Sequence, residues 1–203
     1  MQEHQHPRFV PKICVSGAAS TAYCGPDAME KAKELGREIA QQGAQLLTGA
    51  TTGFPLWAAI GAKEMGGTSI GFSPATSERE HKQVYRLPID YMDLVIYTGF
   101  GYSGRDLILT RSADAVLFGC GRVGTIHEFT VAFEDKKPIG ILEGDWEMDE
   151  TLKLIIDRSH REHSQIVFNP DPKELVKRVL NLVTVNKQNT PITSSYHVPE
   201  TSP

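Results

Sequence analysis

Short apolar runs alternate with segments of helical periodicity from Lys12 onward. This order is typical of a mainly parallel sheet whose connecting helices cover both faces. We therefore expect an α/β, doubly wound fold with a sheet of about seven strands. The strands are expected near residues 13–15, 45–47, 69–72, 94–97, 115–118, 138–142 and 166–168.

The segment after the first expected strand shows why helices are expected in between. Pro26 is suited to a helix start, and Gly43 to its end. Between them, apolar residues recur at close to 3.6-residue spacing, which predicts one buried face. These residues are Met29, Ala32, Leu35, Ile39 and Ala40.

The chain has 203 residues, enough for one domain with its own core. We expect a flexible N-terminus over 1–11, a single domain over 12–185 and a disordered tail over 186–203, which is polar and rich in Pro, Ser and Thr. Residues 74–93 lack a clear period and are expected to form a surface excursion.

Composition argues against several classes of partner. The formal net charge is −4, so no basic surface is expected to hold nucleic acid. No apolar run approaches the ~20 residues of a membrane helix, and the N-terminus lacks the apolar core of a signal peptide. Three cysteines without scaffold spacing argue against a disulfide framework, so Cys24 and Cys120 are expected as free thiols in a cytoplasmic protein. The scattered histidines predict no metal site.

Four loops rich in Gly, Ser and Thr follow expected strands, at residues 16–25, 48–57, 98–106 and 119–128. Each leads into a helix, whose first N–H groups can bind a phosphate. One such loop alone is more often an ordinary turn. Together at one edge of a parallel sheet, they favour a small phosphorylated ligand. The expected binding residues are Gly17, Ser20, Gly49, Thr51, Thr52, Gly53, Gly121, Arg122, Gly124 and Thr125.

A dinucleotide is an alternative ligand. Gly119, Gly121 and Gly124 have the spacing G-x-G-x-x-G, and Glu143 and Asp145 follow at the distance of a ribose-binding acid. That fingerprint normally lies in the first strand-to-helix turn, which lacks it here. An NAD-binding enzyme therefore remains an alternative.

Two charged residues at helix starts are candidates for catalysis. Glu128 lies one turn into its helix, where a carboxylate caps the helix or handles a proton of a ligand. Arg105 opens another helix, where a positive charge is unfavourable without an anionic partner. That partner is either a ligand or Glu128 itself, in a simple salt bridge.

The stretch 120–128 resembles the motif P-G-G-x-G-T-x-x-E of the LOG family, the cytokinin-activating phosphoribohydrolases, and of the related molybdenum-cofactor carrier proteins. "TGATTGFPLWAAIGA" is similar to the family's second-strand loop, "GRDLILTRSADAVLFGC" to its arginine helix, and "KKPIGIL" to the next strand. The resemblance extends from about Lys12 to Leu182.

The resemblance implies a Rossmann-like domain, a homodimer or homotetramer, that binds a nucleoside monophosphate or similar ligand. The implied activity is hydrolysis of the N-glycosidic bond of a nucleoside 5′-monophosphate, with Arg105 and Glu128 as the catalytic pair and no required cofactor. A carboxylate can stabilise the ribosyl cation that forms during such cleavage.

Three positions depart from the family pattern. Cys120 replaces Pro, and Arg122 replaces a Gly expected in a turn, where positive φ would strain an Arg. Asp106 follows Arg105, where the hydrolases have Lys. The triplet Gly104 to Asp106 is closer to the G-R-N of the carrier relatives. A non-catalytic carrier or sensor of a phosphorylated ligand, such as molybdenum cofactor, is therefore the main alternative.

Overall fold

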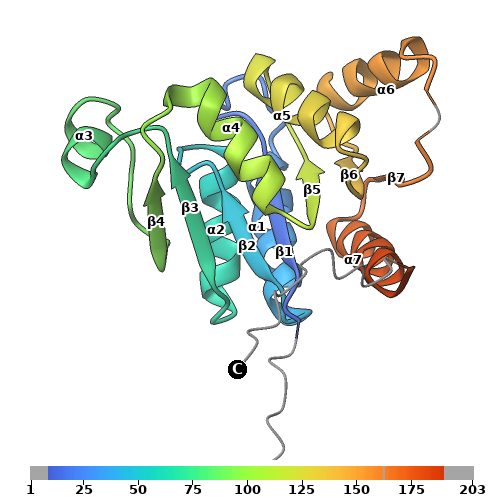
Figure 1. The fold of residues 1–203 in the computed structure, drawn as a ribbon, viewed down its shortest axis with the longest axis horizontal. Helices are drawn as coiled ribbons and strands as arrows, with labels where there is room; N and C mark the ends of the chain where they lie inside the picture. The colour runs from blue at the N-terminus through green and yellow to red at the C-terminus, as the bar shows by residue number, and fades with distance from the viewer. Residues whose placement is uncertain (1–8, 162, 190–203) are drawn as a thin grey trace, which may run out of the picture.

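The computed structural model describes residues 9–161 and 163–189. Within them, seven parallel strands form one sheet in the order β4-β3-β2-β1-β5-β6-β7 (Figure 1). This confirms the predicted α/β, Rossmann-like class. The strands are β1 (Lys12–Ser16), β2 (Gln45–Thr48), β3 (Ser69–Ser73), β4 (Leu94–Tyr97), β5 (Ala115–Phe118), β6 (Ile139–Leu142) and β7 (Ile166–Asn169).

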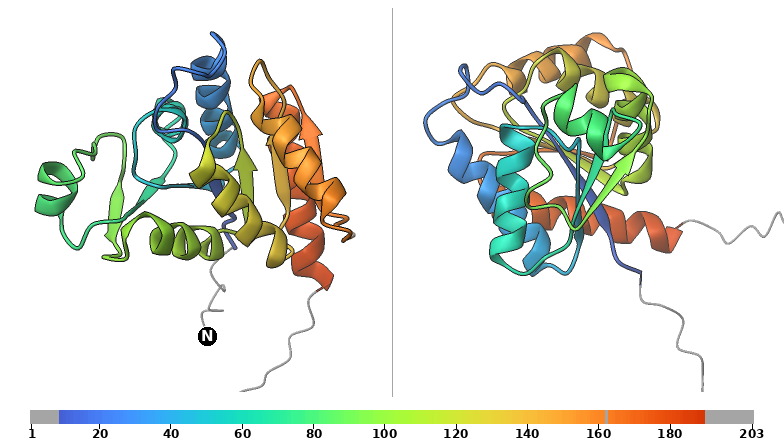
Figure 2. Two further views of the ribbon diagram at one scale, coloured as in Figure 1. Left: turned by 90° about the horizontal axis from the view of Figure 1, so that it is seen from above. Right: turned by 90° about the vertical axis from the view of Figure 1, so that its left-hand side faces the viewer.

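Helices connect successive strands and cover both faces of the sheet (Figures 1 and 2). The helices α1 and α2 pack together on one face, where α7 also contacts α1, and α4 packs against α5 on the other. The helices are α1 (Ala28–Gln41), α2 (Phe54–Glu64), α3 (Glu78–Gln83), α4 (Gly101–Ser112), α5 (Val123–Glu134), α6 (Met148–Arg158) and α7 (Pro172–Asn189).

The strand order reverses between β1 and β5. The chain builds outward from β1 through β4 and then returns to place β5 on the other side of β1, with Cys14 paired to Val116. At such a switch point the loops after the two central strands diverge and leave a crevice. The fold therefore brings the loops after β1 and β5 together.

The core lies on both sides of β1 and β5. All four residues of β5 are buried, as expected for a central parallel strand. In α1 the predicted apolar face is largely correct, but Met29 is 46% exposed while Glu38 is buried. Gly36 lets α1 approach α2 closely, since a Cβ there would lie 1.9 Å from the carbonyl oxygen of Ala58.

Two expected irregular segments contain helix. The excursion over 74–93 includes α3, which Ser77 caps by accepting from the N–H of Glu80. The tail was expected to begin at Asn186, but α7 continues through Asn189. Polar contacts hold this last turn, because Asn186 and Gln165 exchange side-chain hydrogen bonds and Nζ of Lys187 lies 3.3 Å from Oδ1 of Asp114. Residues 1–8 and 190–203 of the expected flexible ends lie outside the described residues.

The cysteines differ from expectation. Cys24 and Cys120 form a disulfide, with Cα atoms 5.6 Å apart and a sequence separation of 96 positions. The prediction of free thiols was wrong because it considered only spacing along the chain. The parallel pairing of β1 and β5 makes their loops neighbours, whatever the separation in sequence. Cys14, inside β1, is a buried free thiol.

Among the residues that the structure describes, no helix has both the length and the apolar character needed to cross a bilayer.

Candidate phosphate-binding site

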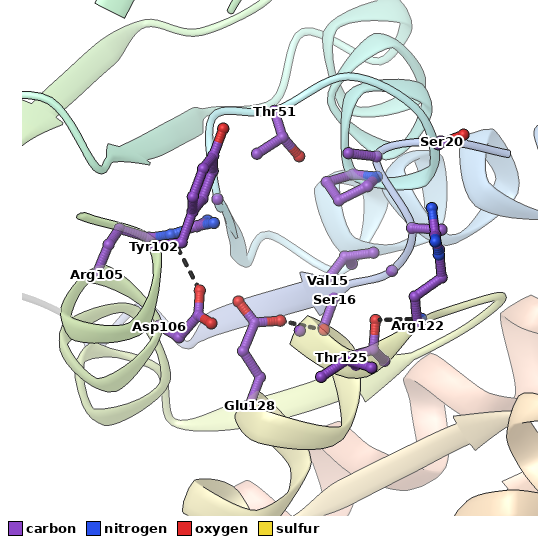
Figure 3. A pocket seen from close by; sticks show the side chains of 17 residues that line it. Val15, Ser16, Ser20, Thr51, Tyr102, Arg105, Asp106, Arg122, Thr125 and Glu128 are labelled. Atoms are coloured by element: carbon purple, nitrogen blue, oxygen red, sulfur yellow. Dashed lines mark hydrogen bonds and ion pairs between the residues drawn. The ribbon is translucent and has the colours of Figure 1, made fainter. Parts of the chain in front are cut away.

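A cavity of about 380 Å³ opens at the switch point, between the loops after β1 and β2 and the first turns of α4 and α5 (Figure 3). Most of the predicted site residues meet in its wall. These are Gly17, Ser20, Gly49, Thr51, Arg105, Arg122, Gly124, Thr125 and Glu128. Residues from four separate loops thus share one cavity, as the parallel sheet predicts.

The N-terminus of α5 forms one side of the cavity. Arg122 is the residue before the first turn, and its backbone N–H donates to Oγ1 of Thr125 at 3.3 Å. The next N–H groups, of Val123 and Gly124, belong to the first helical turn and have no acceptor within the helix. They lie at the positive end of the helix dipole, which favours an anion there.

Arg122 is not strained. Its φ of −140° and ψ of −163° are extended, so the expectation of positive φ at this position was wrong. A residue preceding a helix ordinarily has such angles, and any side chain tolerates them. The exposed Arg122 side chain has no ion pair within the described ranges and lines a second cavity as well.

Arg105 reaches the cavity from α4 and is only 6% exposed. Its Nε lies 3.1 Å from Oδ1 of Asp106, but the direction is wrong for a hydrogen bond, and this N–H is buried without an acceptor. Its ion-pair partner among the described residues is Asp106 rather than Glu128. A buried guanidinium with an unsatisfied donor is a favourable place for an anionic ligand.

Glu128 reaches the cavity from α5 and is 7% exposed. The hydroxyl of Ser16, the last residue of β1, donates to Oε2 of Glu128. Burial raises the pKa of Glu128 to about 7, and the nearby Asp106 carboxylate adds to the rise, while Arg105 and the Ser16 hydroxyl oppose it. Near neutral pH this carboxyl can therefore hold or release a proton.

Three expected binding residues lie just outside this wall. Thr52 donates its hydroxyl to the carbonyl of Ala19 at 3.0 Å, which ties two ligand-side loops together. Gly53 is the residue before α2 and has φ of +71°. It packs against the loop after β1, since a Cβ at this position would lie 2.3 Å from the carbonyl oxygen of Ala18. Gly121 lines the second cavity instead. These three residues shape the loops around the site.

The second cavity, of about 570 Å³, lies on the β6 side of the Arg122 loop. It is bordered by the disulfide residue Cys120, by Tyr23 and by the start of α6. Of the two acids weighed for a dinucleotide, Asp145 lines this cavity. Ser20 and Arg122 lie in the walls of both cavities and so separate them.

Sequence reasoning missed two polar residues of the site. The sequence marks Asp106 only as a departure from a motif, and it places Ser16 at the start of a loop. Both are buried against Glu128 or its partners. A polar residue at the carboxyl end of an otherwise apolar strand is the signal that could have identified Ser16. In the described ranges, no group of three or more His, Cys, Asp or Glu side chains could hold a metal ion.

Comparison with known proteins identifies relatives. The model of the SLOG cluster4 family matches residues 10–176. The molybdenum cofactor carrier protein of Chlamydomonas reinhardtii is 30% identical over 87% of this chain and 99% of that protein's chain, with a TM-score of 0.68. The molybdenum cofactor binding protein of Rippkaea orientalis is 28% identical over 89% of this chain and 99% of the other, with a TM-score of 0.69.

An uncharacterised protein of Archaeoglobus fulgidus is 28% identical over 132 residues, or 65% of this chain and 82% of that protein. These similarities confirm the resemblance to the LOG-type proteins and the molybdenum-cofactor carriers that the motifs predicted. Because the family model matches most of the chain, this protein belongs to the SLOG cluster4 family.

Proposed function

We propose that this protein binds a small phosphorylated ligand in the cavity at the switch point and acts as its carrier, with molybdenum cofactor as the cargo. The observation that carries this proposal is the buried Arg105 guanidinium, whose Nε–H has no acceptor and which lies across the cavity from the start of α5. A phosphate placed between them would satisfy both sets of donors.

The surrounding residues suit the rest of such a ligand. The phosphate is held by the N–H groups of Val123 and Gly124, with the Arg122 side chain free to swing over it. Tyr102, 49% exposed on α4, offers a ring face for stacking an aromatic ring system. The cavity volume falls within the usual range for small-molecule sites. Similarity to two molybdenum-cofactor proteins favours that cargo.

Ligand-dependent thermal stabilisation tests this function, because a ligand that binds only the folded state raises its stability. A phosphorylated pterin should raise the melting temperature, and the same pterin without its phosphate should do so much less. Mass spectrometry of small molecules that co-purify with the protein gives an independent reading. Absence of stabilisation by any phosphorylated pterin or nucleotide contradicts the proposal, and a shift with NAD that AMP fails to reproduce favours the dinucleotide alternative.

A second candidate is the phosphoribohydrolase activity. The observation that favours it is the Glu128 carboxyl, buried beside Arg105 and with its pKa raised to about 7. In this reading Glu128 donates its proton to the leaving base, and the glycosidic C–N electron pair goes to that nitrogen. Water then attacks the ribosyl carbon and gives up a proton to the Glu128 carboxylate, which restores the starting form. Incubation with AMP should then release adenine and ribose 5-phosphate, and Glu128→Gln should stop the release. Intact AMP after long incubation excludes this candidate.

We also propose that the protein is a homodimer or homotetramer, as the family resemblance implies. Large apolar side chains at the start of α4 and of α5 are exposed, including Phe100 at 69% and Val123 at 81%. Light scattering coupled to size-exclusion chromatography should give a mass of two or four chains. A monomer at micromolar concentration contradicts this expectation.

A further inference from the structure

We propose that the Cys24–Cys120 disulfide is a redox switch for the ligand site. A dithiol reductant that breaks this bond frees residues 20–25, which belong to the loop between the two cavities, and so speeds exchange of the bound ligand. The inference rests on the proposed function for its ligand, but the freeing of the loop is measured without any ligand.

The disulfide joins the two loops that separate the cavities. Cys24 belongs to the loop after β1, which places Ser20 in the walls of both cavities and Tyr23 in the wall of the second. Cys120 belongs to the loop after β5, which places Arg122 in both walls. Ser20 and Arg122 lie on the same side of the first cavity (Figure 3). The bond therefore ties together the two loops that form the partition.

The first residues of the loop after β1 are held without the disulfide. The N–H of Ala18 donates to the carbonyl of Cys120 at 2.8 Å, and the carbonyl of Ala18 accepts from the N–H of Phe54 at 2.9 Å. The carbonyl of Ala19 accepts from the Thr52 hydroxyl at 3.0 Å. Because these hydrogen bonds and the pairing of β1 with β5 do not involve the sulfur atoms, reduction should leave the sheet and residues 17–19 in place.

Residues 20–25 depend on the disulfide instead. In the part of the chain that the structure describes, their hydrogen bonds stay within the loop or reach the first residue of α1. The N–H of Cys24 donates to Thr21 at 3.0 Å, and that of Ala28 donates to Gly25 at 3.1 Å. Gly25 packs against the loop between β6 and α6, since a Cβ there would lie 2.9 Å from Cβ of Asp145. A segment with so few hydrogen bonds to the rest of the fold opens readily once its covalent tie is cut.

A reductant can reach the bond from the side of Cys24, which is partly exposed, whereas Cys120 is 3% exposed. A thiolate of the reductant attacks Sγ of Cys24, and the electron pair of the S–S bond goes to Sγ of Cys120. The first residue of α5 follows Cys120 by three positions, and a helix N-terminus favours a nearby thiolate.

The second thiol of the reductant then displaces Cys24, so that the reductant becomes a disulfide and the protein gains two thiols. The protons that the reductant gives up are taken up by the two protein thiolates. The reverse exchange with a small disulfide compound restores the bond.

Fluorescence quenching by acrylamide tests the freeing of the loop on unliganded protein. Trp146 is 8% exposed and lines the second cavity beside Asp145. The chain contains two tryptophans, so Trp57→Phe leaves Trp146 as the reporter. Dithiothreitol should raise the quenching constant by about twofold or more, with an unchanged far-ultraviolet circular dichroism spectrum. Equal quenching overturns the inference, and so does loss of that spectrum, because the bond then holds the whole fold rather than one loop.

Two variants in the Trp57→Phe background show whether the effect comes from this bond. Cys24→Ser should be quenched as strongly as the reduced parent, with or without dithiothreitol. Cys14→Ser retains the bond and should respond to dithiothreitol as the parent does. A response that persists in Cys24→Ser overturns the inference. If Cys24→Ser does not fold, the comparison of the oxidised and reduced parent still decides.

Release of a phosphorylated pterin tests the effect on the ligand. Its dissociation, followed by stopped-flow measurement of the pterin's own fluorescence, should be at least tenfold faster from the reduced protein than from the oxidised protein. Equal rates overturn the control of ligand exchange by the bond. If the pterin does not bind the oxidised protein, the proposed function fails, whereas the quenching experiment still confirms or overturns the freeing of the loop.

Discussion

The Arg105 guanidinium lies against the backbone of Gly49, in the space that any other side chain at position 49 would need. A Cβ built on Gly49 would be 1.5 Å from Nη1 of Arg105. Position 49, directly after β2, therefore has to be a glycine for Arg105 to keep this position in the cavity wall. The glycine was predicted as a backbone contact to the ligand, and the structure adds that it makes room for the arginine.

Gly49→Ala should displace Arg105 and reduce affinity for a phosphorylated ligand at least tenfold. The fold should persist, because the group that has to move is the end of a flexible side chain. Isothermal titration calorimetry measures the affinity. Gly67→Ala is a control outside the cavity wall, before the start of β3, where the new Cβ would meet Cβ of Ala40. Equal affinity in Gly49→Ala and the control would show that Arg105 does not bind the phosphate.

Gly124→Ala should weaken ligand binding while leaving the stability of the fold nearly unchanged. A Cβ at Gly124 would meet no heavy atom within 4 Å, so the melting temperature of the unliganded protein should change little. If the phosphate lies against the first turn of α5, the methyl group intrudes on it and weakens binding. Unchanged affinity would show that the phosphate does not lie against the first turn of α5.

Glu128→Gln should make the protein more stable than the unaltered chain at pH 8. The pKa of Glu128 is raised from 4.5 to about 7, so between these values the folded state retains a proton that the unfolded chain has lost. The contribution of this group to stability therefore falls as pH rises through that window. Above it, the ionised carboxylate costs on the order of 3 kcal/mol, which glutamine removes.

Urea unfolding of both proteins at several values between pH 5 and pH 8 checks this prediction. The stability difference should grow with pH through the window and be small at pH 5, and the effects of other titrating groups cancel in the comparison. If the stability difference between Glu128→Gln and the unaltered protein is no larger at pH 8 than at pH 5, the pKa of Glu128 is not raised.

Reduction of the Cys24–Cys120 disulfide should lower the free energy of unfolding. The bond closes a loop of nearly 100 residues in the unfolded chain, and removal of such a bond typically costs about 2–5 kcal/mol. Cys24→Ser should show the same loss without a reductant. Cys14→Ser is a control that leaves the bond intact, so a reductant should lower the free energy of unfolding of this variant as it does that of the unaltered protein. Equal stability with and without reductant would show that the bond does not form in solution.

The disulfide also joins the two loops that flank both cavities. Ala18 in the first loop donates its N–H to the carbonyl of Cys120 at 2.8 Å, next to the bond itself. Cutting the bond should therefore loosen these loops first, which hydrogen exchange of their amides would report. Protection that is unchanged after reduction would contradict this.

The strand positions were predictable because periodicity depends on local burial. All seven expected strands are present within a residue or two of their predicted bounds. The central strands are apolar runs buried on both faces, and the edge strand β4 is an apolar run that is partly exposed. The helix start of α5 was also predictable, because Gly124 and Thr125 lie within a compact local motif. Met29 was misassigned because a period alone does not reveal which helix face a neighbour covers.

What could not be predicted depends on contacts across the sheet. The pairing of Cys24 with Cys120, and of Ser16 with Glu128, joins residues about 100 positions apart. Such contacts follow from strand order, which periodicity leaves open. The ion pair of Arg105 with the adjacent Asp106 is local instead, but the burial of both side chains depends on how α4 packs on α5.

Calorimetric titration of a phosphorylated pterin into the unaltered protein and into Arg105→Gln tests the central claim most directly. Glutamine keeps polar character but removes the charge and most of the donors that would face the phosphate. The unaltered protein should bind with a single site per chain, and Arg105→Gln should bind at least tenfold more weakly, while Arg111→Gln on the exposed end of α4 should bind normally. Equal binding by Arg105→Gln and the unaltered protein would contradict a phosphate site at this cavity.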